Sequence, residues 1–187
     1  MVTKVTILNT LEPFLSRPRE GIHLLELSRI LNEPPSTIRK HLAHFEKLGI
    51  VKKQIKGRMT IFSLNFNNPG LFQYLFIIEK NKLIKKTEHN LKLKELFFFL
   101  NTNYSSQKYL IFGSFVDDSK KAQDIDLLFI GKIDKNKIND FSKKYNLNLH
   151  LIILKSLNLV SKSLKEEILK KHLIINNTEE FLRWLYG

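Results

Sequence analysis

The chain has 187 residues, 31 Lys and Arg against 18 Asp and Glu, a formal net charge of +13, and no cysteine. This length allows one or two domains. The lack of cysteine excludes disulfide scaffolds, thiolate zinc sites and cysteine nucleophiles. No signal peptide pattern is present, and no window reaches the roughly 18 apolar residues that a membrane helix needs. We therefore expect a cytoplasmic protein with no membrane partner.

The positive charge is concentrated towards the N-terminus. Five of the six arginines lie within the first 60 residues: Arg17, Arg19, Arg29, Arg39 and Arg58. A basic surface attracts nucleic acid by neutralising phosphates, and arginine is suited to phosphate oxygens and base edges. The alternative is that a composition rich in Lys, Asn, Ile and Leu makes the surface diffusely basic without any such partner.

The first part of the chain, residues 1–66, predicts three helices, a short extended piece and a hairpin. Apolar spacing indicates helices over residues 3–15, 24–31 and 36–48, with extended backbone at 22–23. Strands are expected at 50–54 and 59–64, joined by a tip at 55–58. In the third helix, Ser36 is expected to cap the N-terminus. The apolar stripe predicted to face the core consists of Ile38, Leu42, Phe45 and Leu48.

This order, with the segments 35–42 and 45–51, resembles the recognition helix and wing entry of MarR/ArsR-like winged helix-turn-helix regulators. The resemblance implies that residues 1–66 bind double-stranded DNA through the polar face of the third helix and the basic hairpin. The alternative is a winged helix that binds protein and has a merely solvated basic face. The expected DNA-binding residues are Ser36, Thr37, Arg39, Lys40, His44, Lys53, Lys56 and Arg58.

Residues 67–105 are expected to form a helical connector that starts after the turn at 67–70. Two helices are predicted, one over residues 71–86 and one over 91–100. Their apolar surface is broader than one core face needs. This indicates either a homodimer interface through residues 71–100 or an ordinary interdomain core, and the sequence does not separate the two.

The last part, residues 106–187, contains a pattern that carries chemistry. A buried-type strand at 108–112 ends at Gly113 and Ser114, and a second strand opens with Asp124 and Asp126. Side chains at positions i and i+2 of a strand share one face, so the two carboxylates are expected to project together. Paired carboxylates suit Mg²⁺, while glycine allows close backbone approach and serine can contact a phosphate.

Gly113-Ser114, nine residues, and then Asp124-Ile125-Asp126 resembles the signature of the minimal nucleotidyltransferases of the DNA polymerase beta superfamily. Segments 166–170, 173–175 and 179–181 resemble the end of small members of that family. The resemblance implies an α+β chain whose C-terminal domain is a small mixed-sheet α/β fold. It also implies that Mg²⁺ (or Mn²⁺), held by Asp124, Asp126 and a third carboxylate, aligns a nucleoside triphosphate whose outer phosphates contact Gly113 and Ser114.

The third carboxylate is missing from the strand that should supply it. The polar face of that strand, 147–154, carries Asn148 and His150, with Asn146 just before it, so His150 or Asn148 would occupy the third position, and His150 is the expected catalytic residue. Histidine is a poor Mg²⁺ ligand, and His150 could instead be an ordinary strand histidine satisfied by hydrogen bonds. A stand-in carboxylate could come from Asp117 or Asp118.

Three functions remain open from the sequence. In the first, the protein transfers a nucleotide to a protein or nucleic-acid hydroxyl, as in antitoxins that adenylylate a partner toxin, often a HEPN ribonuclease. In the second, it is a DNA-binding regulator whose degenerate transferase-like domain only binds nucleotide or mediates dimerisation. In the third, its basic surface binds RNA as the acceptor.

Overall fold

The computed structural model describes residues 6–117 and 124–187. It is an α+β structure with two small sheets, and it divides into two compact units, residues 1–78 (unit 1) and 79–187 (unit 2). The boundary lies inside one long helix, α3 (Leu71–His89), so it is not marked by a Pro- or Gly-rich linker.

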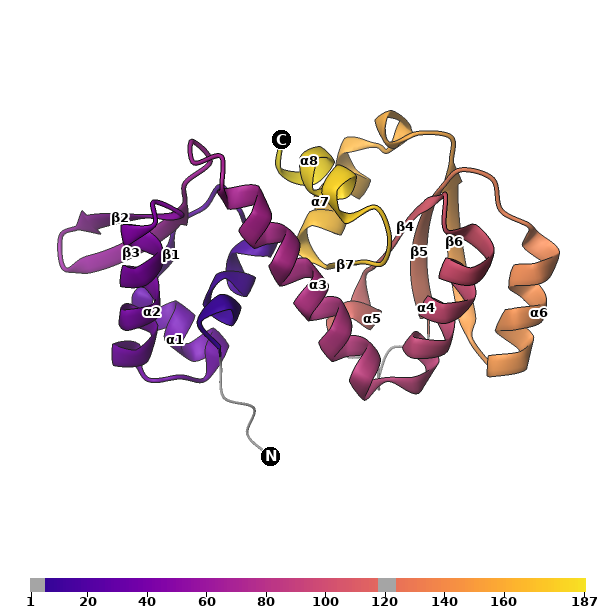
Figure 1. Cartoon of the computed structure of the whole chain (residues 1–187), viewed down its shortest axis with the longest axis horizontal. Helices are drawn as coiled ribbons and strands as arrows, with labels where there is room; N and C mark the ends of the chain where they lie inside the picture. The colour runs from indigo at the N-terminus through magenta and orange to yellow at the C-terminus, as the bar shows by residue number, and fades with distance from the viewer. Residues whose placement is uncertain (1–5, 118–123) are drawn as a thin grey trace. The chain divides into compact units, whose positions relative to one another are not determined.

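Unit 1 combines a three-stranded antiparallel sheet with helices (Figure 1). The sheet order is β1-β3-β2, and β2 pairs with β3 from Val51↔Leu64 to Lys56↔Met59, which makes them a hairpin. The elements, in chain order, are the 3-10 helix η1 (Ile7–Ser16), β1 (Ile22–His23), α1 (Leu24–Leu31), α2 (Pro35–Lys47), β2 (Val51–Lys56) and β3 (Met59–Leu64). The predicted order of elements for this part of the chain is present in the structure.

Helix α2 buries most, but not all, of its predicted stripe. Ile38, Leu42 and Phe45 are at most 1% exposed, whereas Leu48 is 43% exposed. The prediction for Leu48 was wrong because the helix ends at Lys47, and Leu48 already lies in the cap before the positive-φ Gly49. The Ser36 cap was also wrong: the N-cap is Pro34, without a side-chain bond, and Pro35 occupies the first turn, where a missing N–H costs nothing.

The first helical segment differs in type from the prediction. Residues 7–16 form a 3-10 helix with Pro13 inside it, in place of an α-helix over 3–15. Proline has no N–H to donate to a preceding carbonyl, and this weakens the regular α-helical bonding pattern. The segment nonetheless contributes Leu11, Phe14 and Leu15 to the core of unit 1.

Unit 2 is built on a mixed four-stranded sheet of order β6-β5-β4-β7, in which β5 and β6 are parallel and the other pairs are antiparallel (Figure 1). Unit 2 begins within α3, at Glu79. The elements that follow are α4 (Leu91–Tyr104), β4 (Lys108–Phe112), α5 (Ser114–Asp117), β5 (Asp124–Ile130), α6 (Lys135–Tyr145), β6 (Asn148–Leu154), η2 (Leu157–Leu159), α7 (Lys162–Lys170), β7 (His172–Ile174) and α8 (Thr178–Tyr186).

The main core of unit 2 packs α4 and α6 against one face of this sheet. Phe99 of α4 stacks on Phe141 of α6 with ring centroids 4.2 Å apart. The strand residues in this core include Ile111, Ile125, Leu127 and Phe129. Because side chains alternate along a strand, Asp124 and Asp126 lie on the opposite face of β5. Burial of Ile125 between them therefore fixes the direction in which both carboxylates project.

Helices α3 and α4 also expose large apolar side chains. These are Phe76, Ile77 and Ile84 on α3, and Leu91 and Phe98 on α4. An isolated exposed apolar residue is common on a protein surface. The homodimer through residues 71–100 therefore stays a prediction. None of the helices that the structure describes is long and apolar enough to span a membrane.

Candidate nucleotide and metal site

The turn after β4 brings the backbone directly against an acidic side chain. Gly113 has φ +78°, and a Cβ at this position would lie 2.5 Å from Asp126 Oδ2. Its N–H donates to the Lys171 carbonyl, 3.2 Å away, which fixes the turn against the residue before β7. Only glycine fits here without displacing Asp126, since both the backbone angle and the available space exclude a side chain.

The two aspartates at the start of β5 lie where the alternation predicts. Asp124 and Asp126 are partly buried, and Ile125 between them is 1% exposed. Phe112 of β4 pairs with Asp126, so the end of one strand meets the beginning of the next. Gly113, Asp124 and Asp126, which the sequence predicts to act together, thus come from two paired strands at one end of the sheet.

Strand β6 places one polar side chain opposite each carboxylate. The parallel register pairs Asp124 with Asn148 and Asp126 with His150. The Asn148 amide donates a hydrogen bond to Asp124 Oδ1, and His150 Nδ1 lies 3.4 Å from Asp126 Oδ1. The imidazole is 58% exposed, so it is a surface group and not a buried strand histidine. The register thus puts His150 beside Asp126, at a position where the resemblance requires a carboxylate.

The donor set fits one hard cation better than it fits two. Among the residues that the structure describes, no three His, Asp or Glu side chains lie close enough together to hold a metal ion unaided. Mg²⁺ is commonly bound by two protein carboxylates, and its remaining ligands come from water and phosphate. Asp118 lies outside the described residues, as does the side chain of Asp117.

Ser114 follows Gly113 and is exposed at the first position of α5. The next two residues, Phe115 and Val116, are buried in the core of unit 2 and anchor the turn. Ser114 therefore offers its hydroxyl to solvent from a backbone that its neighbours hold in place.

Sequence reasoning missed the polar face of α3 that supports this turn. Lys82 Nζ donates to the His172 carbonyl, and Lys86 Nζ donates to the Val116 carbonyl. Both acceptors lie close in sequence to the turn, because His172 follows Lys171 and Val116 follows Ser114 by two residues. The signal in the sequence is the helical spacing of Glu79, Lys82 and Lys86, which puts them on one face of the predicted helix but does not show what that face contacts.

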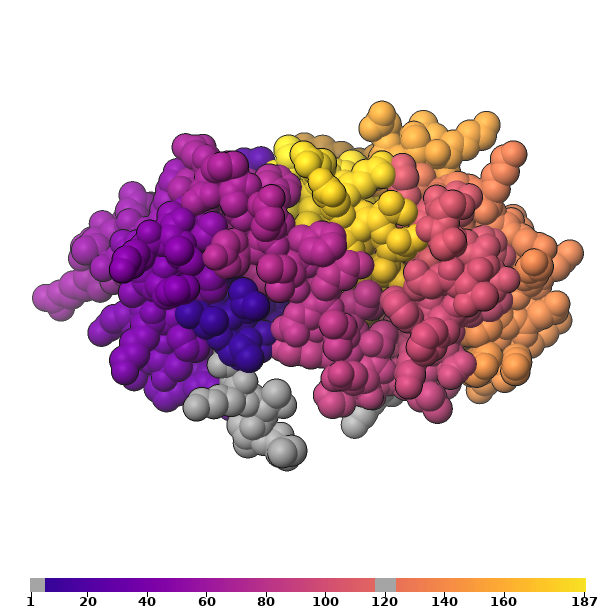
Figure 2. All heavy atoms as spheres, in the orientation of Figure 1, coloured from indigo at the N-terminus to yellow at the C-terminus, as the bar shows by residue number. Residues whose placement is uncertain are grey.

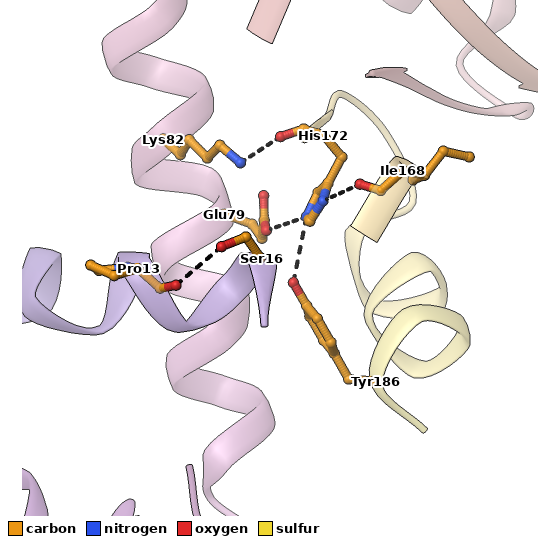
Figure 3. A network of polar contacts seen from close by, with 7 residues as sticks. All are labelled: Pro13, Ser16, Glu79, Lys82, Ile168, His172 and Tyr186. Atoms are coloured by element: carbon orange, nitrogen blue, oxygen red, sulfur yellow. Dashed lines mark hydrogen bonds and ion pairs between the residues drawn. The ribbon is translucent and has the colours of Figure 1, made fainter. Parts of the chain in front are cut away.

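A buried polar network joins α3 to β7 and α8 (Figure 3). Glu79 Oε1 lies 2.7 Å from His172 Nε2, and His172 Nδ1 donates to the Ile168 carbonyl at 2.8 Å. Tyr186 Oη lies 3.4 Å from the same Nε2. Glu79 and His172 are at most 1% exposed. Each imidazole nitrogen thus lies within hydrogen-bond distance of an oxygen, one of a carboxylate and one of a backbone carbonyl.

Burial and neighbouring charges act in opposite directions on the pKa of Glu79, and in the same direction on the pKa of Tyr186. Burial by itself raises the pKa of Glu79, but the charges of His172 and Lys82 outweigh it, and the net pKa is lowered from 4.5. Burial raises the pKa of Tyr186 well above its ordinary value, and the Glu79 carboxylate adds to that rise. Glu79 is therefore favoured in its ionised form although it lies in the interior, with His172 and Lys82 as its neighbours.

The candidate DNA-binding residues lie on α2 and on the hairpin of unit 1. The hairpin tip projects from that unit (Figure 2), and residues 52–59 are exposed. On α2, Ser36, Arg39, Lys40 and His44 are exposed and Thr37 is half-buried; on the hairpin, Lys53, Lys56 and Arg58 are exposed. A cavity of about 270 Å³ between the two elements is lined by Arg39, Ala43, Glu46, Lys53, Ile55, Thr60 and Phe62. Arg39 and Lys53 thus border one cavity, together with an acidic residue, Glu46, that was not predicted.

Comparison with known proteins gives one partial similarity. The chain is 34% identical over 132 residues to the DNA-directed RNA polymerase subunit alpha of Carsonella ruddii (strain PV). The aligned part covers 70% of this chain but only 37% of that protein. No protein-family profile and no solved structure matches the chain. A similarity over little more than a third of the relative does not establish a family for this chain.

Proposed function

We propose that unit 2 binds a nucleoside triphosphate together with a divalent cation and transfers its nucleotidyl group to a hydroxyl of a protein or nucleic acid. Unit 1, in this proposal, is a winged helix that binds double-stranded DNA. The proposal for unit 2 rests on the packing of Gly113 against Asp126. A Cβ added at Gly113 would come within 2.5 Å of the Asp126 carboxylate. The glycine lets the backbone of the turn pack directly against the Asp126 carboxylate, on the face of β5 that also carries Asp124, which supports a site where backbone and carboxylates contact one ligand.

The proposed chemistry divides between charge and positioning. Asp124 and Asp126 would hold Mg²⁺ or Mn²⁺, which would neutralise charge on the triphosphate. Gly113 and Ser114 would contact the outer phosphates through the backbone and the hydroxyl. In the transfer, the acceptor oxygen forms a bond to the α-phosphorus, the bond to the pyrophosphate leaving group breaks, and the hydroxyl proton passes to solvent. Positioning of both reactants and neutralisation of charge together supply most of the rate enhancement in reactions of this kind.

The experiment is a transfer assay with ATP labelled in the α-phosphate. Purified protein is incubated with Mg²⁺ or Mn²⁺ and with cell extract, and the products are separated into protein and nucleic acid. We expect label in one of these fractions for the wild type and none for Asp124→Asn, which keeps the size of the side chain and removes its charge. A toxin partner predicts a labelled protein, and an RNA acceptor predicts label that ribonuclease removes.

A second candidate is favoured by the polar face of β6. The residues opposite the carboxylates are Asn148 and His150, so the described part of β6 supplies no third carboxylate. A regulator that binds nucleotide as an effector, or uses unit 2 to dimerise, would need no such group. In that case the labelled triphosphate binds with the cation but no product carries label, and nucleotide changes the DNA affinity or the oligomeric state.

A further inference from the structure

We propose that the cation site is a mixed oxygen and nitrogen site, completed by His150, that selects Mn²⁺ over Mg²⁺. This inference rests on the proposed function, because it concerns the ion that accompanies the triphosphate. It goes further in naming His150 as a direct ligand and in naming the ion that such a ligand prefers.

The geometry of the β5–β6 pair supports shared ligation. The parallel register puts His150 directly beside Asp126, and the atoms that face each other are Nδ1 and Oδ1, 3.4 Å apart. Two adjacent ligands of one octahedral ion, each about 2.1 Å from it, are about 3 Å apart. A small side-chain adjustment would therefore let both atoms bind one ion. The imidazole is more than half exposed, which leaves its outer side open to the nucleotide and to water.

Asp124 is held differently from Asp126. The Asn148 amide already donates to Asp124 Oδ1, so one oxygen of this carboxylate is oriented by a neutral donor. A partner of this kind fixes the direction of a ligand and tunes the ion it binds. Asp126 and His150 are therefore the pair expected to take the ion first, and Asp124 would add an oxygen only after its side chain moves, because the three groups do not lie together as the structure has them.

The chemistry of the donors decides which ion fits. Mg²⁺ prefers oxygen ligands almost exclusively and demands near-ideal octahedral geometry. Imidazole suits transition metals, whereas carboxylate and water suit Mn²⁺ as well as Mg²⁺. The chain has no cysteine, so the site has no thiolate ligand that would favour softer ions. Of the two ions that the resemblance implies, Mn²⁺ is the one that accepts both the nitrogen of His150 and the oxygens around it.

The test measures Mn²⁺ binding by electron paramagnetic resonance and calorimetry, with a non-hydrolysable ATP analogue present and absent. Three variants of the full chain are compared with the wild type: His150→Ala, His150→Asp, and His89→Ala as a control for an exposed histidine elsewhere in unit 2. We expect Mn²⁺ to bind the wild type with the analogue more tightly than Mg²⁺ does. His150→Ala should weaken Mn²⁺ binding by about tenfold and remove the nitrogen coupling from the spectrum. His150→Asp should bring the affinities for Mn²⁺ and Mg²⁺ close together, and His89→Ala should change neither affinity.

Two outcomes overturn the inference, and they can be told apart. If Mg²⁺ binds as tightly as Mn²⁺ in the wild type, or if neither His150 variant changes the ratio of affinities, His150 is not a ligand and the proposed function stands. If the analogue binds with neither ion, the proposed function fails and the inference fails with it. Fluorescence of Trp184, the chain's one tryptophan, checks that unit 2 remains folded in each variant.

Discussion

Gly113 combines a backbone conformation that favours glycine with a direct contact to Asp126 of the candidate site. Its φ of +78° lies in the left-handed region, and the nearest atom to an added Cβ is Asp126 Oδ2 at 2.5 Å. Gly113→Ala should lose most of the triphosphate affinity, because the methyl group displaces Asp126, and should also lower stability by about 1–2 kcal/mol through backbone strain. Nucleotide binding and urea unfolding followed by Trp184 fluorescence measure the two effects.

The matched control for that change is Gly57→Ala. Gly57 has φ +59°, but nothing lies within 4 Å of an added Cβ, so this variant carries the strain without the collision. Equal losses of nucleotide affinity in the two variants would show that the position of Asp126 does not matter for binding.

Glu79 is the residue whose charge should make unit 2 sensitive to acid. Its pKa in the folded protein is lowered from 4.5, so its stabilising contribution is fully present above pH 4.5 and is lost as the pH falls through the folded value. Glu79→Ala should destabilise unit 2 by about 3–5 kcal/mol at neutral pH, because it leaves His172 buried without its anionic partner. Urea unfolding on both sides of pH 4.5, read from Trp184, measures this difference.

Glu79→Gln separates charge from shape in the same experiment. It keeps the size of the side chain and should remove the part of the acid dependence that Glu79 causes. Glu88→Ala, on an exposed position of the same helix, should shift the unfolding free energy by no more than about 0.5 kcal/mol. An acid dependence that is the same in the wild type and in Glu79→Gln would assign the effect to another group.

At the scale of elements, α2 and the β2–β3 hairpin make a prediction about DNA. Lys53 is an exposed hairpin lysine, and its contact should be to phosphate; Lys53→Ala should therefore weaken binding to all duplexes alike and lower the salt slope by about one. Arg39→Ala, on the helix, should weaken binding in a sequence-dependent way. Fluorescence anisotropy with several duplexes of defined and different sequence, each over a series of salt concentrations, measures both.

The control for the DNA measurement is Lys143→Ala, an exposed lysine of α6 in unit 2. It removes one positive charge from the chain without touching the predicted face. If Lys143→Ala and Lys53→Ala lower the salt slope equally, binding follows the net charge of +13 and unit 1 presents no dedicated DNA surface.

Local patterns predicted the elements well because each depends on neighbouring residues. The alternation in β5 placed Ile125 inside and both aspartates on the other face, and the strand at 108–112 has the predicted bounds. The patterns failed for two features. They predicted an α-helix where the segment with Pro13 forms the 3-10 helix η1, and they predicted a buried Leu48 where α2 has already ended. The Asn148–Asp124 and His150–Asp126 contacts depend on strand register, which is set across the sheet and is not written in either strand alone.

At the scale of the whole molecule, the chain is two compact units with different predicted tasks. Long-range contacts organise unit 2 in a way that the sequence did not reveal: Glu79 and His172 are 93 positions apart but share one buried network. No local spacing indicates such a pair, because both residues read as ordinary helix and strand positions. The lysines of α3, which the sequence presents as a charged run, prove to bond to the backbone on either side of the Gly113 turn.

The most direct measurement for the central claim is the binding of an ATP analogue in the presence of Mn²⁺, compared between the wild type, Asp124→Asn and Asp126→Asn. Both the transferase and the nucleotide-responsive regulator require this binding, so it precedes any test of transfer. The site predicts metal-dependent binding by the wild type and a loss of about tenfold or more in each variant, with Trp184 fluorescence unchanged. Equal binding by all three proteins, or binding that does not depend on the metal, would contradict a nucleotide site at Asp124 and Asp126.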